Sequence, residues 1–219
     1  MTPADFDRTE ILQFLRTPSL DERLTAELDA AIEALCRAAQ PRTVWRQIPL
    51  THTESGVVLG TLPLIGKDIA LHLSGCEAAV LLAATLSGST DSLIRRAERS
   101  DMTKALLLDA AAGAAIEHIC SALEQELKKT LPYPYFTERF SAGYGDFPIA
   151  QQADLVRLLD AEKRIGLTVT PQCTMVPMKS VTALIGLSHQ PVRDARRFCC
   201  GKSCAECPYR EDCAGAKRT

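Results

Sequence analysis

The chain has 219 residues, enough to bury a sizeable hydrophobic core as one large domain or as one domain with an appendage. Hydrophobic residues make up 46% and charged residues 24% of the sequence, which is ordinary globular composition. The formal net charge of −2 gives no global field that would attract nucleic acid or an anionic membrane. Apolar runs such as 78–86 are too short to span a bilayer, and the N-terminus lacks the basic and apolar regions of a secretion signal. We therefore expect a cytoplasmic protein without nucleic-acid or membrane partners.

Helices are expected wherever apolar residues recur at helical spacing. The pattern Ser19-x-x-Glu22 is a capping box that opens the second of these helices, and Ser100 is expected to cap the longest. The predicted helices cover residues 5–16, the stretch from the capping box to just before Pro41, and residues 67–73, 91–99, 101–129 and 151–159.

Strands are expected where apolar and β-branched residues alternate or run on without interruption. Residues 43–50 and 56–62 flank a polar turn, and the continuous apolar run 77–86 suits a strand buried on both faces. Two further strands, 165–170 and 180–188, are joined by a link that contains Pro171 and Pro177.

The longest predicted helix carries Asp109, Gly113 and Glu117 at four-residue spacing, so these residues occupy neighbouring turns of one face. Alanine dominates the helix around Gly113, which predicts that another element packs closely there. The two carboxylates are interpreted first as solvated side chains.

The stretch 139–148 (Arg-Phe-Ser-Ala-Gly-Tyr-Gly-Asp-Phe-Pro) has the composition of a ligand-binding loop. Gly143 and Gly145 can take positive φ and let a ligand approach the main chain. Arg139 offers a planar fork of donors to a heteroaromatic ring, and Tyr144 adds a second flat surface with a polar tip. From the residues alone, a ligand loop and a structural turn both remain open.

The nine cysteines fall into two groups. Cys36, Cys76, Cys120 and Cys173 lie in apolar surroundings and are expected to be small buried hydrophobes. The other five crowd into residues 191–219, a basic segment that we interpret as an appended metal- or cluster-binding tail. Four of them have the spacing of a ligand set for a tetrahedral ion or an iron–sulfur cluster, with Cys199 as a spare: Cys200, Cys204, Cys207 and Cys213. An iron–sulfur cluster is favoured because zinc usually uses two Cys-x2-Cys pairs and only one is present; zinc, and free or redox thiols, are the alternatives.

Three motifs follow one another in order: Arg139-Phe-Ser-Ala-Gly143-Tyr144, Ile-Gly-Leu-Thr-Val-Thr at 165–170, and Met175-Val-Pro-Met-Lys-Ser-Val181 with Ser188-His189 after it. They resemble the activation domain of cobalamin-dependent methionine synthase. The N-terminal half, through Lys67-Asp68-Ile69-Ala70 and residues 101–117, resembles a stand-alone short form of it. The resemblance covers roughly residues 20–190 and implies an α+β fold with a twisted antiparallel sheet flanked by helices. We therefore expect a domain over residues 1–190, followed by the metal-binding tail at 191–219 that the cysteines indicate.

The resemblance also implies S-adenosylmethionine binding, with Arg139, Gly143 and Tyr144 around the adenosyl group. Phe140, Ser141 and Gly145 belong to the same loop. Gly113 stands where the full-length enzymes carry a carboxylate, and Glu117, one turn further on, is the substitute. For a second acidic position, near the first strand, Glu54 is the nearest candidate.

The implied task is reactivation: inactive cob(II)alamin on a partner is re-methylated with one electron and the methyl group of S-adenosylmethionine. The partner would be a truncated cobalamin-dependent methionine synthase or another corrinoid protein, together with a low-potential electron donor. The chain would be an accessory component of this methyltransferase, and no residue is assigned a catalytic role. The alternative is an iron–sulfur or zinc electron-transfer or interaction module whose S-adenosylmethionine loop is vestigial.

Overall fold

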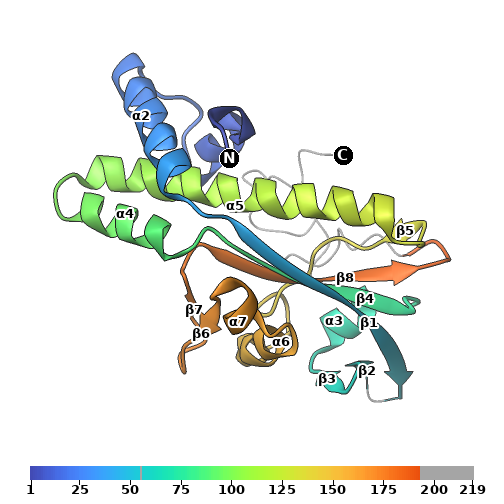
Figure 1. Ribbon diagram of the computed structural model, residues 1–219. Helices are drawn as coiled ribbons and strands as arrows, with labels where there is room; N and C mark the ends of the chain where they lie inside the picture. The colour runs from blue at the N-terminus through green and yellow to red at the C-terminus, as the bar shows by residue number, and fades with distance from the viewer. Residues whose placement is uncertain (55, 193–219) are drawn as a thin grey trace. The chain divides into compact units, whose positions relative to one another are not determined.

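The structure is a computed structural model that describes residues 1–54 and 56–192 (Figure 1). These residues form two compact units. Unit 1 comprises Met1–Val44, Ala83–Thr130 and Val156–Val181, and unit 2 comprises Trp45–Leu82, Leu131–Leu155 and, among the described residues, 182–192. The four predicted metal ligands, Cys200, Cys204, Cys207 and Cys213, lie outside the described residues. The predicted division of the chain at residue 190 therefore stays a prediction.

Six strands form one sheet in the order β3-β2-β1-β4-β8-β5. Register pairs such as Leu50↔Leu59 and Phe136↔Leu187 make β1–β2 and β5–β8 antiparallel. The N–H groups of Leu86 and Glu77 donate to the carbonyls of Lys179 and Leu187, so β4 and β8 also run in opposite directions. The predicted α+β fold with an antiparallel sheet is confirmed. Its strands are β1 (Arg42–Thr53), β2 (Gly56–Leu59), β3 (Leu62–Leu64), β4 (Ala78–Thr85), β5 (Tyr135–Phe136) and β8 (Ser180–Ser188).

Two of these strands match their predicted positions closely. Strand β8 has the predicted bounds, and every residue of β4 is buried, as its continuous apolar run indicates. The predicted strand 165–170 is wrong in its first half, because Ile165 ends a short helix and Gly166, at φ 71°, caps that helix in the left-handed conformation. Only β6 (Thr168–Val169) remains of it, paired with β7 (Met175–Val176) in a separate two-stranded sheet.

Three helices of unit 1, α1, α2 and α4, pack along its longest helix, α5 (Figure 1). Asp7, Asp21 and Asp101 cap α1, α2 and α5 by accepting a backbone N–H two or three residues further on, at 2.7–3.0 Å. Ser19 and Ser100, the predicted caps, do not fill these positions. The helices are α1 (Arg8–Leu15), α2 (Glu22–Ala38), α3 (Lys67–His72), α4 (Gly88–Glu98), α5 (Met102–Thr130), α6 (Gln152–Leu158) and α7 (Ala161–Ile165), with short 3-10 turns η1 (Pro3–Asp5) and η2 (Ile149–Gln151).

Helix α5 is the core of unit 1. Within the described part of the chain it is the one helix long and apolar enough to cross a membrane, yet 61% of its apolar stretch is buried in the structure. Asp109, predicted to be solvated, is exposed but forms an ion pair with Lys179, at 2.8 Å. Of the four scattered cysteines, Cys76 and Cys120 are buried as predicted, whereas Cys36 and Cys173 are only partly buried.

The close packing predicted at Gly113 is confirmed, and its partner is Phe14 of α1. A Cβ placed on Gly113 would lie 3.2 Å from the Cε2 and Cζ atoms of the Phe14 ring. The ring therefore packs in the space that the missing side chain leaves, and α1 rests directly on the backbone of α5.

This contact predicts coupling between the two residues. Replacing a helix-interior glycine by alanine normally stabilises a protein by about 0.5–1 kcal/mol. In the wild-type background, Gly113→Ala should not give this stabilisation, because the Phe14 ring must move away from the new methyl group. In a Phe14→Ala background the gain should appear in full, as measured by urea unfolding. Gly88→Ala, at an open site in α4, is the matched control and should have the same effect in both backgrounds. An equal effect of Gly113→Ala in both would contradict the predicted coupling.

Candidate functional site

The candidate ligand loop, residues 139–148 of unit 2, is attached to strand β8. Phe140 forms an isolated antiparallel bridge with Leu184, with N–H to carbonyl distances of 2.9 and 2.8 Å. The Ser141 hydroxyl donates to the carbonyl of Thr182 at 2.8 Å. Phe140 is buried and its ring lies 6.3 Å from that of the buried Phe147. Of the predicted ligand residues, Phe140 and Ser141 thus hold the loop in place.

The tip of the loop is a compact double turn. Gly143 donates its N–H to the carbonyl of Phe147 at 2.8 Å, and Phe147 donates to that of Tyr144 at 3.0 Å. Gly143 and Gly145 have φ angles of 94° and 53°, which confirms the predicted need for glycine. Gly143, Tyr144 and Gly145 are exposed, and the Tyr144 side chain is 56% exposed. Arg139 is partly buried at the base of the loop.

Asp146 ties the loop to the N-terminus of α3. Its carboxylate accepts the N–H groups of Lys67 and Asp68, at 2.7 and 2.9 Å. In return, the N–H of Asp146 donates to the Asp68 carboxylate at 3.1 Å. The N–H groups of Asp68 and Lys67 lower the pKa of Asp146 below its ordinary value, so this carboxylate stays ionised at neutral pH.

Asp68 is a site residue that sequence reasoning missed. Its carboxylate lies so close to Gly145 that any side chain at position 145 would collide with it. The only local signal was an acidic residue in the first turn of a predicted helix, which is common at helix starts. Nothing in the local pattern points to a loop 78 residues further along the chain. Glu54, the acidic candidate from the sequence, lies instead at the turn between β1 and β2.

Two buried glutamines fix the segment that follows the loop. The side-chain amide of Gln151 donates to the carbonyl of Pro63 at 2.8 Å and accepts the N–H of Ile65 at 2.7 Å. Gln152 donates to the hydroxyl of Thr182 at 2.6 Å. Because both amides are desolvated and bonded, the loop is held from both ends in one geometry.

His72 lies beneath the loop, with its ring centre 4.8 Å from that of Phe140. Its Nε2 atom is 2.9 Å from the carbonyl oxygen of Glu138. The Thr137 hydroxyl lies 2.8 Å from the same nitrogen and donates to the Glu138 carbonyl at 3.0 Å. With the hydroxyl proton on that carbonyl, Nε2 carries the ring proton and donates, since a carbonyl only accepts. Within the described part of the chain, Nδ1 is buried without a hydrogen-bond partner. Burial lowers the pKa of His72 below its ordinary value of 6.5, so the imidazole is neutral at physiological pH.

Glu117, the remaining residue predicted to contact the ligand, is partly buried on α5 of unit 1. The loop belongs to unit 2, so the proposed association of Glu117 with it stays a prediction. Among residues 1–54 and 56–192 there is no group of three or more His, Cys, Asp or Glu side chains that could hold a metal ion.

Comparison with known proteins identifies the family. The family model described as "Vitamin B12 dependent methionine synthase, activation domain" matches residues 92–207, more than half of the chain. The chain belongs to this family. A crystal structure of the MetH reactivation domain bound to AdoHcy has a similar fold, with a TM-score of 0.66. It is 16% identical to this activation-domain protein, and the match covers 97% of this chain and 83% of the other. No match was found among curated proteins.

The buried neutral His72 predicts a pH dependence of stability. Its folded-state pKa lies below the unfolded value of about 6.5, so the unfolded chain binds the proton first. The contribution of His72 is complete above pH 6.5 and is lost as the pH falls through the folded-state pKa, by at most about 1.4 kcal/mol per pH unit. Urea unfolding between pH 7.5 and 5.0 should give a flatter pH dependence for His72→Gln than for wild type. Parallel curves would contradict this assignment.

Proposed function

We propose that this protein is a stand-alone activation-domain protein that binds S-adenosylmethionine at residues 139–145 and presents it to the corrinoid of a partner. The observation that carries the proposal is a hydrogen-bonded loop with two left-handed glycines and an exposed tip at residues 143–146, found in a member of the activation-domain family. The partner is a truncated cobalamin-dependent methionine synthase or another corrinoid protein. Its re-methylation consumes one electron and the methyl group of S-adenosylmethionine. The chain supplies positioning rather than a catalytic residue.

The hydrogen bonds of the loop limit how it can hold this ligand. The N–H groups of Gly143, Tyr144, Asp146 and Phe147 already donate within unit 2. Ligand contacts from these residues must therefore come from side chains and carbonyl oxygens. Tyr144 offers an exposed ring for stacking on adenine, and Arg139 adds a guanidinium at the base of the loop.

Asp68 supplies the negative charge that a cationic ligand needs. One of its carboxylate oxygens accepts the N–H of Asp146, and the other has no partner in the described part of the chain. S-adenosylmethionine carries a positive sulfonium and a positive ammonium group. A carboxylate fixed against the loop would attract these charges without having to be ordered first.

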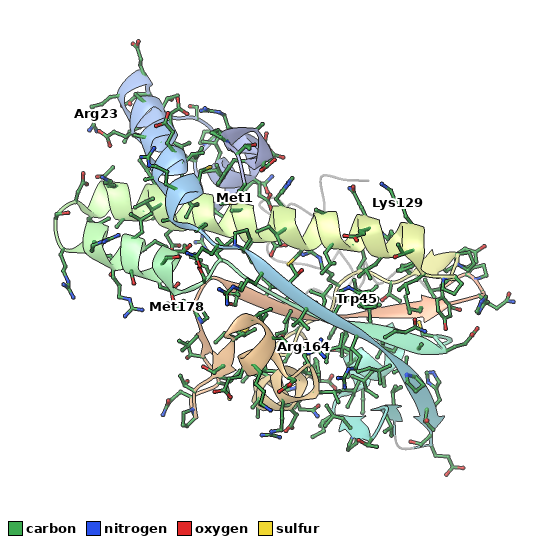
Figure 2. The ribbon with its side chains drawn as sticks, in the orientation of Figure 1. Met1, Arg23, Trp45, Lys129, Arg164 and Met178 are labelled. Atoms are coloured by element: carbon green, nitrogen blue, oxygen red, sulfur yellow. The ribbon has the colours of Figure 1, made fainter. Side chains whose placement is uncertain are left out.

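Binding measurements on the full chain test these roles. Arg139→Ala should weaken S-adenosylmethionine binding at least tenfold in calorimetry, because it removes the guanidinium from the base of the loop. Asp68→Asn keeps an oxygen for the N–H of Asp146 but removes the charge. It should weaken S-adenosylmethionine severalfold and S-adenosylhomocysteine less, because the latter lacks the sulfonium charge. Arg164→Ala, on α7 in unit 1 (Figure 2), is the control. If the wild-type protein does not bind S-adenosylmethionine, the proposal is wrong and the electron-transfer module is favoured.

Exposed apolar side chains around the loop support docking to a protein partner. Ile65, Tyr144 and Ile149 are 58%, 56% and 49% exposed, the highest values among the large apolar side chains of unit 2 in the described residues. Ile149 lies against Gly143, and the Ile65 main chain is bonded to Gln151, so the three surround one end of the loop. A ligand that transfers its methyl group to a partner must be presented on a face that the partner covers. This apolar rim is suited to that burial.

Loss of the rim should weaken complex formation and leave ligand affinity intact. Ile65→Ser and Ile149→Ser should each lower the affinity for a cobalamin-loaded corrinoid-binding domain of methionine synthase about fivefold or more. Binding of S-adenosylmethionine should change less than twofold. Met178→Ser is the matched control, because Met178 is 64% exposed in unit 1 (Figure 2). Unchanged complex affinity in both isoleucine variants would remove the rim from the interface.

The cysteine-rich tail supports a role in electron transfer, either in the proposed reactivation or as the alternative module. Cys200, Cys204, Cys207 and Cys213 provide four thiolates within fourteen residues, in a spacing that suits a cluster. We propose that an iron–sulfur centre in the tail delivers the electron for re-methylation, or docks the protein that does.

Metal content distinguishes the cluster from zinc. Anaerobic reconstitution with iron and sulfide should give charge-transfer absorbance in wild type that is lost in Cys204→Ser with Cys207→Ser. Cys36→Ser, a cysteine outside the tail, is the control and should retain the cluster. Stoichiometric zinc in the purified protein, with no absorbance after reconstitution, would refute the cluster.

A further inference from the structure

We infer a second small-molecule site in unit 1, which binds an amphipathic cation. A groove of about 430 Å³ lies between the α1–α2 connection and the first turns of α5. This volume falls within the range of small-molecule pockets, roughly 300–1,000 Å³. Leu15, Leu20, Leu24 and Leu106 are among its lining residues. The walls at Leu15 to Leu24 precede the segment matched by the family model, so the site goes beyond the proposed function.

The connection that forms one wall is held open by its own hydrogen bonds. Arg16 ends α1 in the left-handed conformation, with φ 54°, and turns the chain away from the helix axis. The Thr17 hydroxyl then donates to the carbonyl of Ser19 at 2.8 Å, and Asp21 starts α2. At the other end, packing of Phe14 on Gly113 fixes α1 against α5. The groove therefore exists before any ligand arrives.

The chemistry of the lining selects the ligand. Its apolar surface comes from leucines, which match a hydrocarbon or aromatic body. The polar residues of its lining are Thr17, Ser19, Thr103 and Asp21. None of the described residues that line the groove is basic. The one charged residue among the described lining residues is therefore acidic.

Asp21 also disfavours the binding of an anionic ligand at the N-terminus of α2. The N-terminus of α2 alone would attract negative charge. One carboxylate oxygen of Asp21 accepts the N–H of Leu24 at 2.7 Å and so occupies that end of the helix. The second oxygen has no partner among residues 1–54 and 56–192, which leaves it free to accept from an ammonium group.

The first turns of α5, which form one side of the groove, carry exposed apolar side chains. Leu106 lines the groove and is 57% exposed, and Met102, one turn earlier on α5, is 69% exposed. An apolar body longer than the groove would cover these side chains, while its cationic group pairs with Asp21. The combination of an apolar body and one positive charge defines the ligand class.

Three matched probes test the site on the full chain: 4-phenylbutylamine, 4-phenylbutanol and 4-phenylbutyrate, with affinities measured by NMR titration at low salt. The amine should bind at least tenfold more tightly than the acid, with the alcohol between them. Asp21→Asn should remove most of this preference. Because asparagine is also a good N-cap, α2 should keep its stability. Leu106→Ser should weaken binding of all three probes, and Leu71→Ser, at an exposed leucine of unit 2, should weaken none.

The inference is overturned if the amine and the acid bind equally, or if no probe binds at millimolar concentration. It is also overturned if Asp21→Asn leaves the preference unchanged while far-UV circular dichroism shows an intact fold. Tight binding that responds to Leu71→Ser but not to Leu106→Ser would place the probe elsewhere and refute the site. None of these outcomes depends on S-adenosylmethionine binding, which is measured separately on the same protein.

Discussion

Two aspartates, 78 residues apart, hold the candidate site together by accepting each other's backbone N–H groups. Asp146 caps the start of α3, and Asp68 in that first turn accepts from the main chain of Asp146. Each carboxylate satisfies donors that would otherwise have only water as a partner. Gly66 and Gly145 have no side chains, and a Cβ at either position would collide with the opposing aspartate. This contact holds the tip of the loop against the start of α3.

The remaining supports of the loop serve the same purpose. The bridge between Phe140 and Leu184 attaches it to the sheet, and the amides of Gln151 and Gln152 secure its exit. His72 fills the space beneath it as a neutral ring, because a charged imidazole would be costly there. A loop supported in this way loses little conformational entropy when it binds a ligand. Such preorganisation suits the function proposed above, in which the loop positions a methyl donor for chemistry on a partner.

Unit 1 shows a second use of a missing side chain. Glycine at position 113 has a low helix propensity, but it lets the Phe14 ring pack against the backbone of α5. This contact joins α1 to α5. The alanine-rich sequence of α5 keeps its buried faces thin, so neighbouring helices approach closely. The connection from α1 to α2 leaves a groove between itself and the first turns of α5.

The sequence by itself determined the elements that carry a strong periodic signal and the residues that carry the family motif. Strands β4 and β8 and helices α3 and α5 were predictable because long apolar runs and helical spacing are local properties. The positive φ angles of Gly143 and Gly145 were also predictable from their residue type.

Only the tertiary structure decided which distant groups meet. The two-residue strands β5 and β7 are too short to show alternation, and they form because a partner strand lies beside them. Asp68 at the loop, the cap of α3 by Asp146 and the packing of Phe14 on Gly113 depend on where the chain returns in space, which no local pattern encodes. Residue types and spacings specify what a segment can do. Which contacts a segment makes depends on the atoms that the fold places next to that segment.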